Sequence, residues 1–278
     1  MINKLHITAA IKNERTILKD CFFTQPFRVA NISEDRKDPR LYLMVMSSSP
    51  GLLNEDKYAI DINVETGAEL MLQSQAYQRV FKMKGSARIQ QQINVGNNAS
   101  LYYVPHPVVP HNGSTLLAES EFFMKEGSRL VFADILTCGR KHSGELFQYA
   151  SFTNRIALHF EDRLIYKDNI VLEPASGNTY GMGQFEGYTH QAGFLIADMT
   201  RKMEDTFFDS VHDILCTEQS ISFGITRAHD HLLAGRILAN GGEQLFQLLK
   251  QVESFAGNYW KPRPENKRIL MIPENPVL

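Results

Sequence analysis

The sequence is poor in cysteine, has no excess of either charge and contains no long apolar run. Three cysteines, Cys21, Cys138 and Cys216, stand far apart among 278 residues, a spacing that fits neither a disulfide framework nor a zinc site. The 29 basic and 31 acidic residues nearly cancel, which argues against nucleic acid as a partner. The longest apolar run, residues 41–46, is far shorter than the roughly 20 residues of a membrane helix. We therefore expect a cytoplasmic protein that contacts no membrane.

Motifs of the common catalytic classes are also missing. There is no P-loop and no His-Glu-x-x-His sequence, so neither GTP hydrolysis nor metalloprotease chemistry is predicted. Gly181, Gly183 and Gly187 superficially resemble a dinucleotide-binding loop, but their spacing is wrong for one. The sequence therefore contains no recognisable motif for catalysis or for a tightly bound cofactor.

Alternation of apolar and polar residues dominates the first two thirds of the chain. Its period of two predicts strands at residues 89–95, 101–104, 129–135 and 147–152. No helical period of useful length separates them, which argues against βαβ architecture and for an all-β fold. We expect one domain over residues 1–278, because all-β folds often reach this length undivided.

One short pattern recurs about every 30 residues. Its copies are Val64-x-x-Gly67-Ala68-x-Leu70, Val95-x-x-Asn98-Ala99-x-Leu101 and Met124-x-x-Gly127-Ser128-x-Leu130. Gly or Asn suits a tight turn with positive φ, and the small residue that follows leaves room for the chain to reverse. Stacked strand-turn-strand units predict a β-helix-like, layered β scaffold, although chance similarity among ordinary hairpins is an alternative.

Helices are expected only in the last third of the chain. Residues 243–255 have a helical apolar period, follow Gly241-Gly242 and precede Gly257 as a C-terminal stop. Residues 204–216 show a second amphipathic pattern. The prolines and charges after Trp260 indicate an extended tail over residues 260–278. The expected fold is thus all-β with two helices in the C-terminal region.

Histidines offer two candidate metal sites. His229 and His231 would project from the same face of a strand, but no third ligand is evident, so a surface or core role is the simpler interpretation. His106 and His111 lie in a proline-rich loop that could bind a metal. The simpler interpretation is that this loop shapes an interface.

Two carboxylates stand next to turns. Asp56 follows the Pro50-Gly51 turn, and Glu145 follows Gly144 at the expected start of a strand. Either carboxylate is a candidate to line a pathway. The simpler interpretation is that Asp56 caps its turn and that Glu145 pairs with Arg140.

Several residue strings, in chain order, resemble the UreD/UreH family of urease accessory proteins. The most specific is Cys138-Gly139-Arg140-Lys141-His142-Ser143-Gly144-Glu145-Leu146-Phe147, which is similar to the family's Gly-Arg-x-x-x-Gly-Glu-x-Phe. The others are Phe22–Arg28, Ser49-Pro50-Gly51 with Asp56, Gln73–Phe81, Tyr103–Pro110 and Phe185–His190. The sequence departs from the family at Leu52 and Glu55, which replace glycines near Asp56, and at His111, which replaces a Phe.

The resemblance implies a β-helix-like fold with two helices and a non-catalytic role in urease maturation. Such a protein would bind urease apoprotein and act with F-type and G-type accessory proteins in GTP-dependent nickel insertion, with an E-type chaperone bringing the metal. It would hold urease open, or give nickel in transit a route with few ligands at each step. Glu145 and Asp56 are the residues expected to line that route, with Arg140 orienting Glu145. Gly144, Pro50 and Gly51 are expected to shape the loops.

Two other readings remain open. A generic β-rich interaction module would bind a partner without any dependence on nickel. A β-solenoid carbohydrate-active enzyme would require two acids projecting from one face of neighbouring coils.

Overall fold

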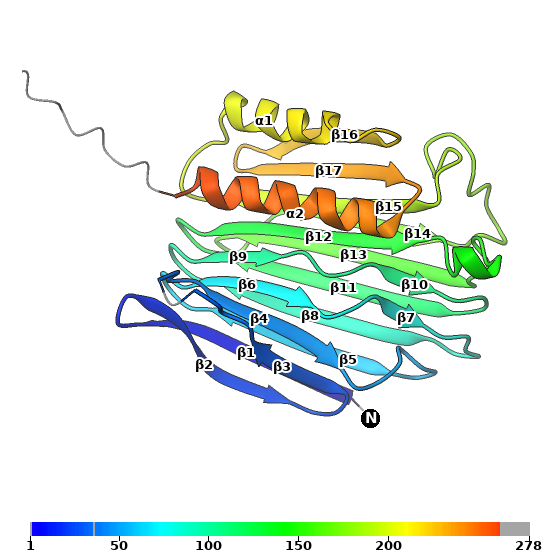
Figure 1. Cartoon of the computed structure of the whole chain (residues 1–278), viewed down its shortest axis with the longest axis horizontal. Coiled ribbons are helices and arrows are strands. Elements are labelled where there is room, and N and C mark those ends of the chain that lie inside the picture. Colours follow the sequence, from blue (N-terminus) through cyan, green and yellow to red (C-terminus); the bar gives the residue numbers. More distant parts are fainter. Residues whose placement is uncertain (1, 36, 262–278) are drawn as a thin grey trace, which may run out of the picture.

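The computed structural model describes residues 2–35 and 37–261, which form two β-sheets packed face to face with two helices on one side (Figure 1). The first sheet contains, in order, β14 (Arg163–Leu172), β13 (Ser151–Phe160), β11 (Thr115–Met124), β8 (Ala87–Val95), β5 (Lys57–Val64), β1 (Ile2–Lys12) and β2 (Arg15–Phe23). The second contains β16 (Ser222–His229), β17 (Leu232–Ala239), β15 (His190–Asp198), β12 (Arg129–Thr137), β9 (Ser100–Tyr103), β6 (Glu69–Ser74), β4 (Leu41–Ser47) and β3 (Phe27–Asn31). Two short strands, β10 (Val108–Pro110) and β7 (Gln78–Val80), pair beside β12.

Successive coils of the chain pass from the first sheet through a tight turn into the second. β5, β8 and β11 run parallel and in register in the first sheet, and β6, β9 and β12 do so in the second. Gly67, Asn98 and Gly127 occupy the same place in three stacked turns, with φ between 54° and 73°. The predicted repeat of about 30 residues is thus confirmed, because stacked turns need the same left-handed backbone in each coil.

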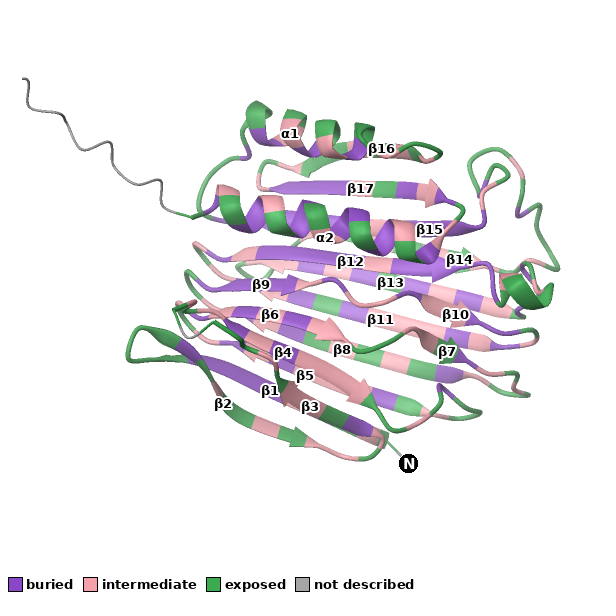
Figure 2. Ribbon diagram, in the orientation of Figure 1, coloured by how far each residue is buried: buried purple, intermediate pink, exposed green. Residues whose placement is uncertain are grey.

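The protein has two hydrophobic cores. One lies between the sheets, and the other lies between the second sheet and the helices. Alternate residues of β12 serve the two cores, with Leu130 and Phe132 facing the first sheet and Val131 and Ala133 facing the helices. Figure 2 accordingly shows β12 and β15 buried along most of their length, whereas β8 and β11 alternate between buried and more exposed residues.

Both predicted helices are present as α1 (Asp205–Cys216) and α2 (Gly242–Tyr259). The prediction that Gly257 ends the second helix is wrong, since this residue lies inside α2. A Cβ atom at position 257 would stand 3.3 Å from the Tyr102 ring. Gly257 therefore allows α2 to pack closely on β9 and does not end the helix.

A strand at residues 147–152 was also expected, but β13 begins only at Ser151. Phe147 has a φ of 52°, which no regular strand accommodates. Glu145 consequently lies in a loop after a short 3₁₀ helix, η1 (Lys141–Ser143), and does not start a strand.

The expected tail begins at Trp260, which is buried and stacks near Phe207 and Tyr102. Residues 262–278 of that tail lie outside the described residues. Within the described part of the chain, neither helix is long and apolar enough to cross a membrane.

Candidate functional site

Loops at one end of the two sheets stack on one another, at the right of Figure 1. They comprise residues 48–56, 81–86, 111–114, 138–150 and 173–189, and we call them the loop end. Backbone hydrogen bonds link neighbours, for example Met83 N to Gly113 O at 3.3 Å and Gly113 N to Gln148 O at 2.9 Å. Three of the strings that resemble the family motifs, at residues 49–56, 138–147 and 185–190, therefore lie at this end of the molecule.

The Pro50-Gly51 turn lies directly against β7. Leu52 N donates to Arg79 O at 2.8 Å, and a Cβ atom on Gly51 would stand 2.5 Å from the same oxygen. Only glycine allows this close approach of the two backbones. Asp56 closes the turn, because its Oδ2 accepts a hydrogen bond from Leu53 N at 2.7 Å. The contacts of Asp56 thus agree with the interpretation that this residue caps its turn.

Glu145 is held by Arg140 and by the loop beneath it. The Arg140 guanidinium donates to both carboxylate oxygens, with 2.9 Å between Nε and Oε2, and Asn112 N donates to Oε2 at 3.2 Å. The hydrogen bond from Arg140 is the main cause that lowers the pKa of Glu145. Gly144 ends η1 with a φ of 77°, which turns the chain toward this ion pair. The expected orientation of Glu145 by Arg140 is present, while a role toward nickel stays a prediction.

Lys141 ties this loop to the second sheet. Its Nζ donates to Asn240 O at 3.0 Å and to Thr189 Oγ1 at 3.3 Å. Thr189 in turn lies 2.8 Å from Nδ1 of His190. Burial, followed by the nearby Lys141 charge, lowers the pKa of His190 to about 4. A neutral imidazole at this position serves as a fixed hydrogen-bonding group.

A cavity of about 390 Å³ opens between the sheets beside the loop end. The more exposed part of its lining, which we call the mouth, is formed by residues 49–51, 74–79, 105, 106 and 108, which belong to three of the strings singled out in the sequence. Deeper in, its wall carries Gln91, Ser120, Asp134 and Asn154. Neither Asp56 nor Glu145 lines the cavity, because both carboxylates are used within the loops.

Asp134 on β12 is the carboxylate at the inner end of this cavity. Its Oδ2 accepts a hydrogen bond from Asn154 Nδ2 at 2.8 Å. Burial, reinforced by the charge of Asp168, raises the pKa of Asp134 to about 7. Asp134 also lines a second hollow of about 400 Å³, which Asp168 and Arg236 border with an ion pair of 2.7 Å. One carboxylate thus lies between two hollows on opposite sides of β12.

Asp134 was not among the residues singled out in the sequence. The available signal was a carboxylate within an otherwise apolar strand, Arg129-Leu-Val-Phe-Ala-Asp-Ile135. Its position on the inward face follows from the alternation with Leu130 and Phe132.

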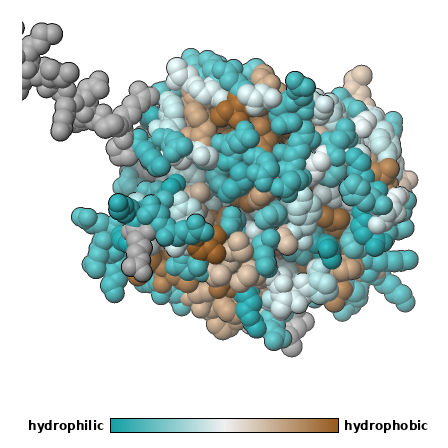
Figure 3. Space-filling view, in the orientation of Figure 1, coloured by the Kyte–Doolittle hydropathy of each residue, from teal (hydrophilic) through white to brown (hydrophobic). Residues whose placement is uncertain are grey.

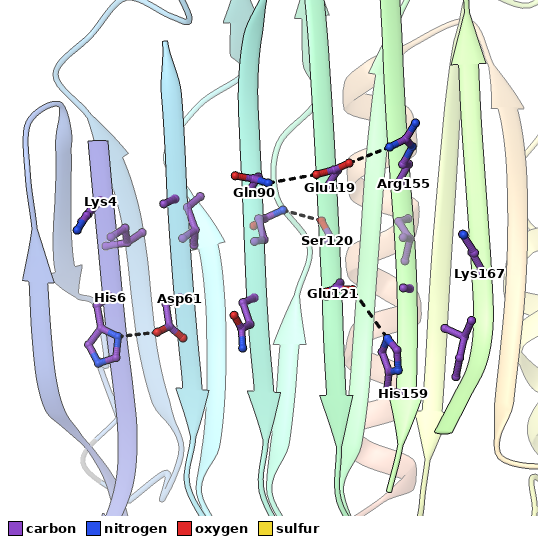
Figure 4. A pocket seen from close by; sticks show the side chains of 18 of the residues that line it. Lys4, His6, Asp61, Gln90, Glu119, Ser120, Glu121, Arg155, His159 and Lys167 are labelled. Atoms are coloured by element: carbon purple, nitrogen blue, oxygen red, sulfur yellow. Dashed lines mark hydrogen bonds and ion pairs between the residues drawn. The ribbon is translucent and has the colours of Figure 1, made fainter. Parts of the chain in front are cut away.

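Another hollow, of about 720 Å³, lies on the outer face of the first sheet (Figure 4). Polar side chains cross it in rows, including Arg155 to Glu119 at 3.0 Å and His6 to Asp61 at 3.2 Å. Asp61 and Glu121 share a row but are separated by Gln92. A carbohydrate-active enzyme would need two acids here, one of them in an apolar setting. Glu121 does not fit that role, because 56% of its side chain is exposed and His159 faces it. We therefore interpret the rows as ion pairs and hydrogen bonds between neighbouring strands.

The two candidate histidine sites differ in their contacts. His231 lies in the turn after β16, and its Nδ1 is 2.9 Å from Arg201 O and 3.1 Å from Asp198 O. His229 Nδ1 accepts a hydrogen bond from His231 N at 3.3 Å. His106 stacks on Phe246 and lies 3.0 Å from Ser74 Oγ at the cavity mouth. His111 packs edge-on against Phe81. Among the described residues, no group of three or more His, Cys, Asp and Glu side chains is placed to hold a metal ion.

Apolar side chains are exposed at the loop end. They are Leu53, Leu146, Tyr180 and Met182, with exposed fractions from 39% for Leu146 to 96% for Met182. We call them the apolar rim. Figure 3 shows a separate hydrophobic area over β4 and β6, below the mostly hydrophilic outer surface of α2. Exposed apolar groups on loops are candidates for a protein contact surface.

Comparison with known proteins gives a consistent result. A sequence profile described as UreD urease accessory protein matches residues 3–270. A urease accessory protein UreD of Flavobacterium johnsoniae is 40% identical over 253 residues, covering 91% of both chains. A UreD of Acetivibrio thermocellus is 31% identical over 91% of this chain and 96% of its own. A urease accessory protein UreH of Helicobacter pylori is 25% identical over 86% of this chain and 88% of its own.

Proposed function

The chain belongs to the UreD family of urease accessory proteins, and from that premise we propose that it is a non-catalytic factor that helps to load nickel into urease apoprotein. In this proposal it binds the apoprotein and acts with an F-type and a G-type accessory protein. The G-type partner hydrolyses GTP, and an E-type chaperone supplies the metal indirectly. The complex works in the cytoplasm, and nickel is its cargo.

The cavity between the sheets is the observation that carries the proposal. A divalent ion crossing a protein needs oxygen and nitrogen groups that replace its water shell, but too many ligands at one point would trap it. The cavity wall offers hydroxyl and amide groups from Ser49, Ser74, Gln91 and Ser120, with one carboxylate, Asp134, at the inner end. This distribution suits an ion in transit.

Asp134 is the group proposed to draw the ion inward. Its pKa of about 7 makes the carboxylate partly ionised near neutral pH, and Asn154 holds one oxygen in place. The second hollow, bordered by Asp168 and Arg236, continues on the other side of Asp134. A route through the protein would therefore pass this carboxylate.

The loop end is proposed to contact the apoprotein. The apolar rim provides apolar contact area, and the Arg140–Glu145 ion pair stands beside it with a half-exposed guanidinium. Contact at this end would place the cavity mouth close to the partner. It would also let the chain act by holding urease open.

The proposal is tested by urease activity per unit of urease protein in cells that make all urease subunits and accessory proteins, with and without this chain. Lower activity and lower bound nickel at constant urease abundance would support it. Full activity and full nickel content without the chain would overturn it and would leave the generic interaction module as the function to pursue.

A further inference from the structure

The exposed face of α1 carries a histidine and a cysteine one helical turn apart. Phe207, Val211 and Leu215 form the buried face of the helix. His212 and Cys216 lie on the opposite side, where both side chains are exposed. The i, i+4 spacing brings the imidazole and the thiol together in the last turn.

The distance between the two donors suits chelation of one ion. Cys216 Sγ lies 3.6 Å from Nδ1 of His212 and 3.9 Å from Nε2. A tetrahedral ion with a metal–sulfur bond of about 2.3 Å and a metal–nitrogen bond of about 2.0 Å requires the two donors to be about 3.5 Å apart. The sulfur is almost equally far from both ring nitrogens and so lies over the ring. Turning the exposed imidazole about its Cβ–Cγ bond would point one nitrogen at an ion shared with Sγ.

We propose that His212 and Cys216 form a two-ligand site for a thiophilic divalent metal ion of the late first transition series, such as Co²⁺, Ni²⁺ or Zn²⁺. A thiolate and an imidazole are the donors that these ions favour, whereas Mg²⁺ and Ca²⁺ favour oxygen. Water completes the coordination sphere, so the ion exchanges readily. The site is separate from the cavity and does not depend on the proposed function.

The surroundings of the pair favour a cation. α1 ends at Cys216, and Thr217 N donates to Asp213 O and Ile214 O at its end. The C-terminus of a helix carries partial negative charge, which attracts cations. Asp213 adds a carboxylate oxygen 4.0 Å from Nδ1 of His212. The negative potential on this side of the helix offsets part of the cost of bringing a doubly charged ion to the surface.

The other two cysteines provide internal controls. Cys138 is buried and Cys21 is partly buried, and burial raises the pKa of both thiols. A metal ion binds a thiol that it can reach and that loses its proton. Burial therefore makes Cys21 and Cys138 poor ligands, whereas Cys216 is exposed.

The test is a titration of the reduced full-length protein with Co²⁺, followed by thiolate-to-cobalt charge-transfer absorption. Alkylation of each cysteine by iodoacetamide is mapped in parallel by mass spectrometry. We expect one equivalent of Co²⁺ to produce the absorption and to protect Cys216 from alkylation, with tighter binding at higher pH. The variant Cys216→Ser should lose the absorption, and His212→Ala should bind at least about tenfold more weakly. The control Cys21→Ser should behave as the unchanged protein.

Cys216→Ser changes one exposed atom, and His212→Ala removes an edge contact of the imidazole with Phe223. Both variants should still fold, which circular dichroism checks. Absorption that persists in Cys216→Ser, or His212→Ala that binds as tightly as the unchanged protein, would overturn the proposal. A disulfide-linked dimer through Cys216 with no metal protection would also overturn it.

Discussion

Asn154 on β13 donates a hydrogen bond of 2.8 Å to Asp134 on β12, and this contact joins the two sheets across their interior. An amide can hold a carboxylate in place but cannot neutralise it. The ionised form is therefore costly inside the protein, which is why the pKa of Asp134 is raised. The protonation state of Asp134 therefore affects stability and, in the proposed function, the passage of nickel as well.

Replacement of Asp134 by Asn should change how stability depends on pH. The pKa of Asp134 is about 7 in the folded protein, above the ordinary value of 3.8. The folded state thus binds the Asp134 proton more tightly than the unfolded state does. The free energy of unfolding therefore falls as the pH rises from about 4 to 7. At pH 8, Asp134→Asn should be more stable than the unchanged protein by about 2 kcal/mol, since water in the cavity screens part of the shift. Urea unfolding at pH 5 and pH 8 measures this, and equal pH slopes for both proteins would contradict it.

Filling the cavity should lower the delivery of nickel. Ala118 faces inward from β11 and lines the cavity, whereas Ala157 on β13 lines the hollow on the outer face. We expect Ala118→Leu to reduce urease activity and bound nickel in cells, because the added side chain narrows the route. Ala157→Leu adds the same group outside and should leave both unchanged. Equal activity of the two variants, with both proteins folded, would argue that the chain acts only by opening urease.

The Arg140–Glu145 pair allows a structural role to be separated from a role toward nickel. If Glu145 only shapes the loop, Arg140→Ala and Glu145→Ala should lower urease activation equally, and the double variant should lower it no further. A larger loss for Glu145→Ala alone would indicate contact with the cargo. The pKa of Glu145 is lowered by Arg140, so the pair's stabilising effect should disappear as the pH falls below the ordinary carboxyl range.

Gly51→Ala should destabilise the protein by about 1–3 kcal/mol. The new Cβ would stand 2.5 Å from Arg79 O, and backbone atoms cannot yield as a flexible side chain can. Gly224→Ala is the matched control, because no atom lies within 4 Å of its Cβ position. Thermal unfolding of both variants provides the measurement. An unchanged midpoint for Gly51→Ala would contradict the prediction and show that the Pro50-Gly51 turn can move away from β7 at little cost.

The apolar rim should matter for binding to the apoprotein. Leu146→Asp combined with Met182→Asp places charge on two exposed apolar positions, which should weaken co-purification with urease apoprotein. Phe22→Asp changes an apolar residue that is also exposed (54%) but lies on β2, at the far edge of the first sheet. Loss of binding in the Phe22 variant, with binding retained in the rim variant, would move the interface to the opposite edge.

Local pattern was enough to predict the scaffold. Gly67, Asn98 and Gly127 reveal the stacked turns because positive φ restricts the choice of residue at each turn. The helical period of Leu245, Leu248 and Val252 reveals α2 because one face must be apolar. These signals are local and do not depend on distant contacts.

The site could be predicted only in part, because it depends on contacts between coils. Whether Glu145 meets Arg140 or the cavity is decided by the 3₁₀ turn at residues 141–143, which has no strong signal in the sequence. Gly257 was read as a stop because its packing against Tyr102 comes from a residue 155 positions earlier. The strings that resemble the family did not indicate which side chains face the cavity, since Asp134 and Asn154 lie outside or at the end of every string.

The in-register coils also have a consequence for how the chain folds. Each of β8, β11 and β13 pairs with the strand one coil earlier in the chain, so the structure can grow by adding coils in the order of synthesis. β1 differs, since its parallel partner β5 begins some 45 residues after β1 ends. β1 is synthesised first, so its edge toward β5 remains an unpaired template until β5 has been made, and unpaired strand edges associate with other chains. Substitutions that weaken the β1–β5 pairing should therefore first be visible as aggregation during synthesis, before any loss of stability in the finished protein.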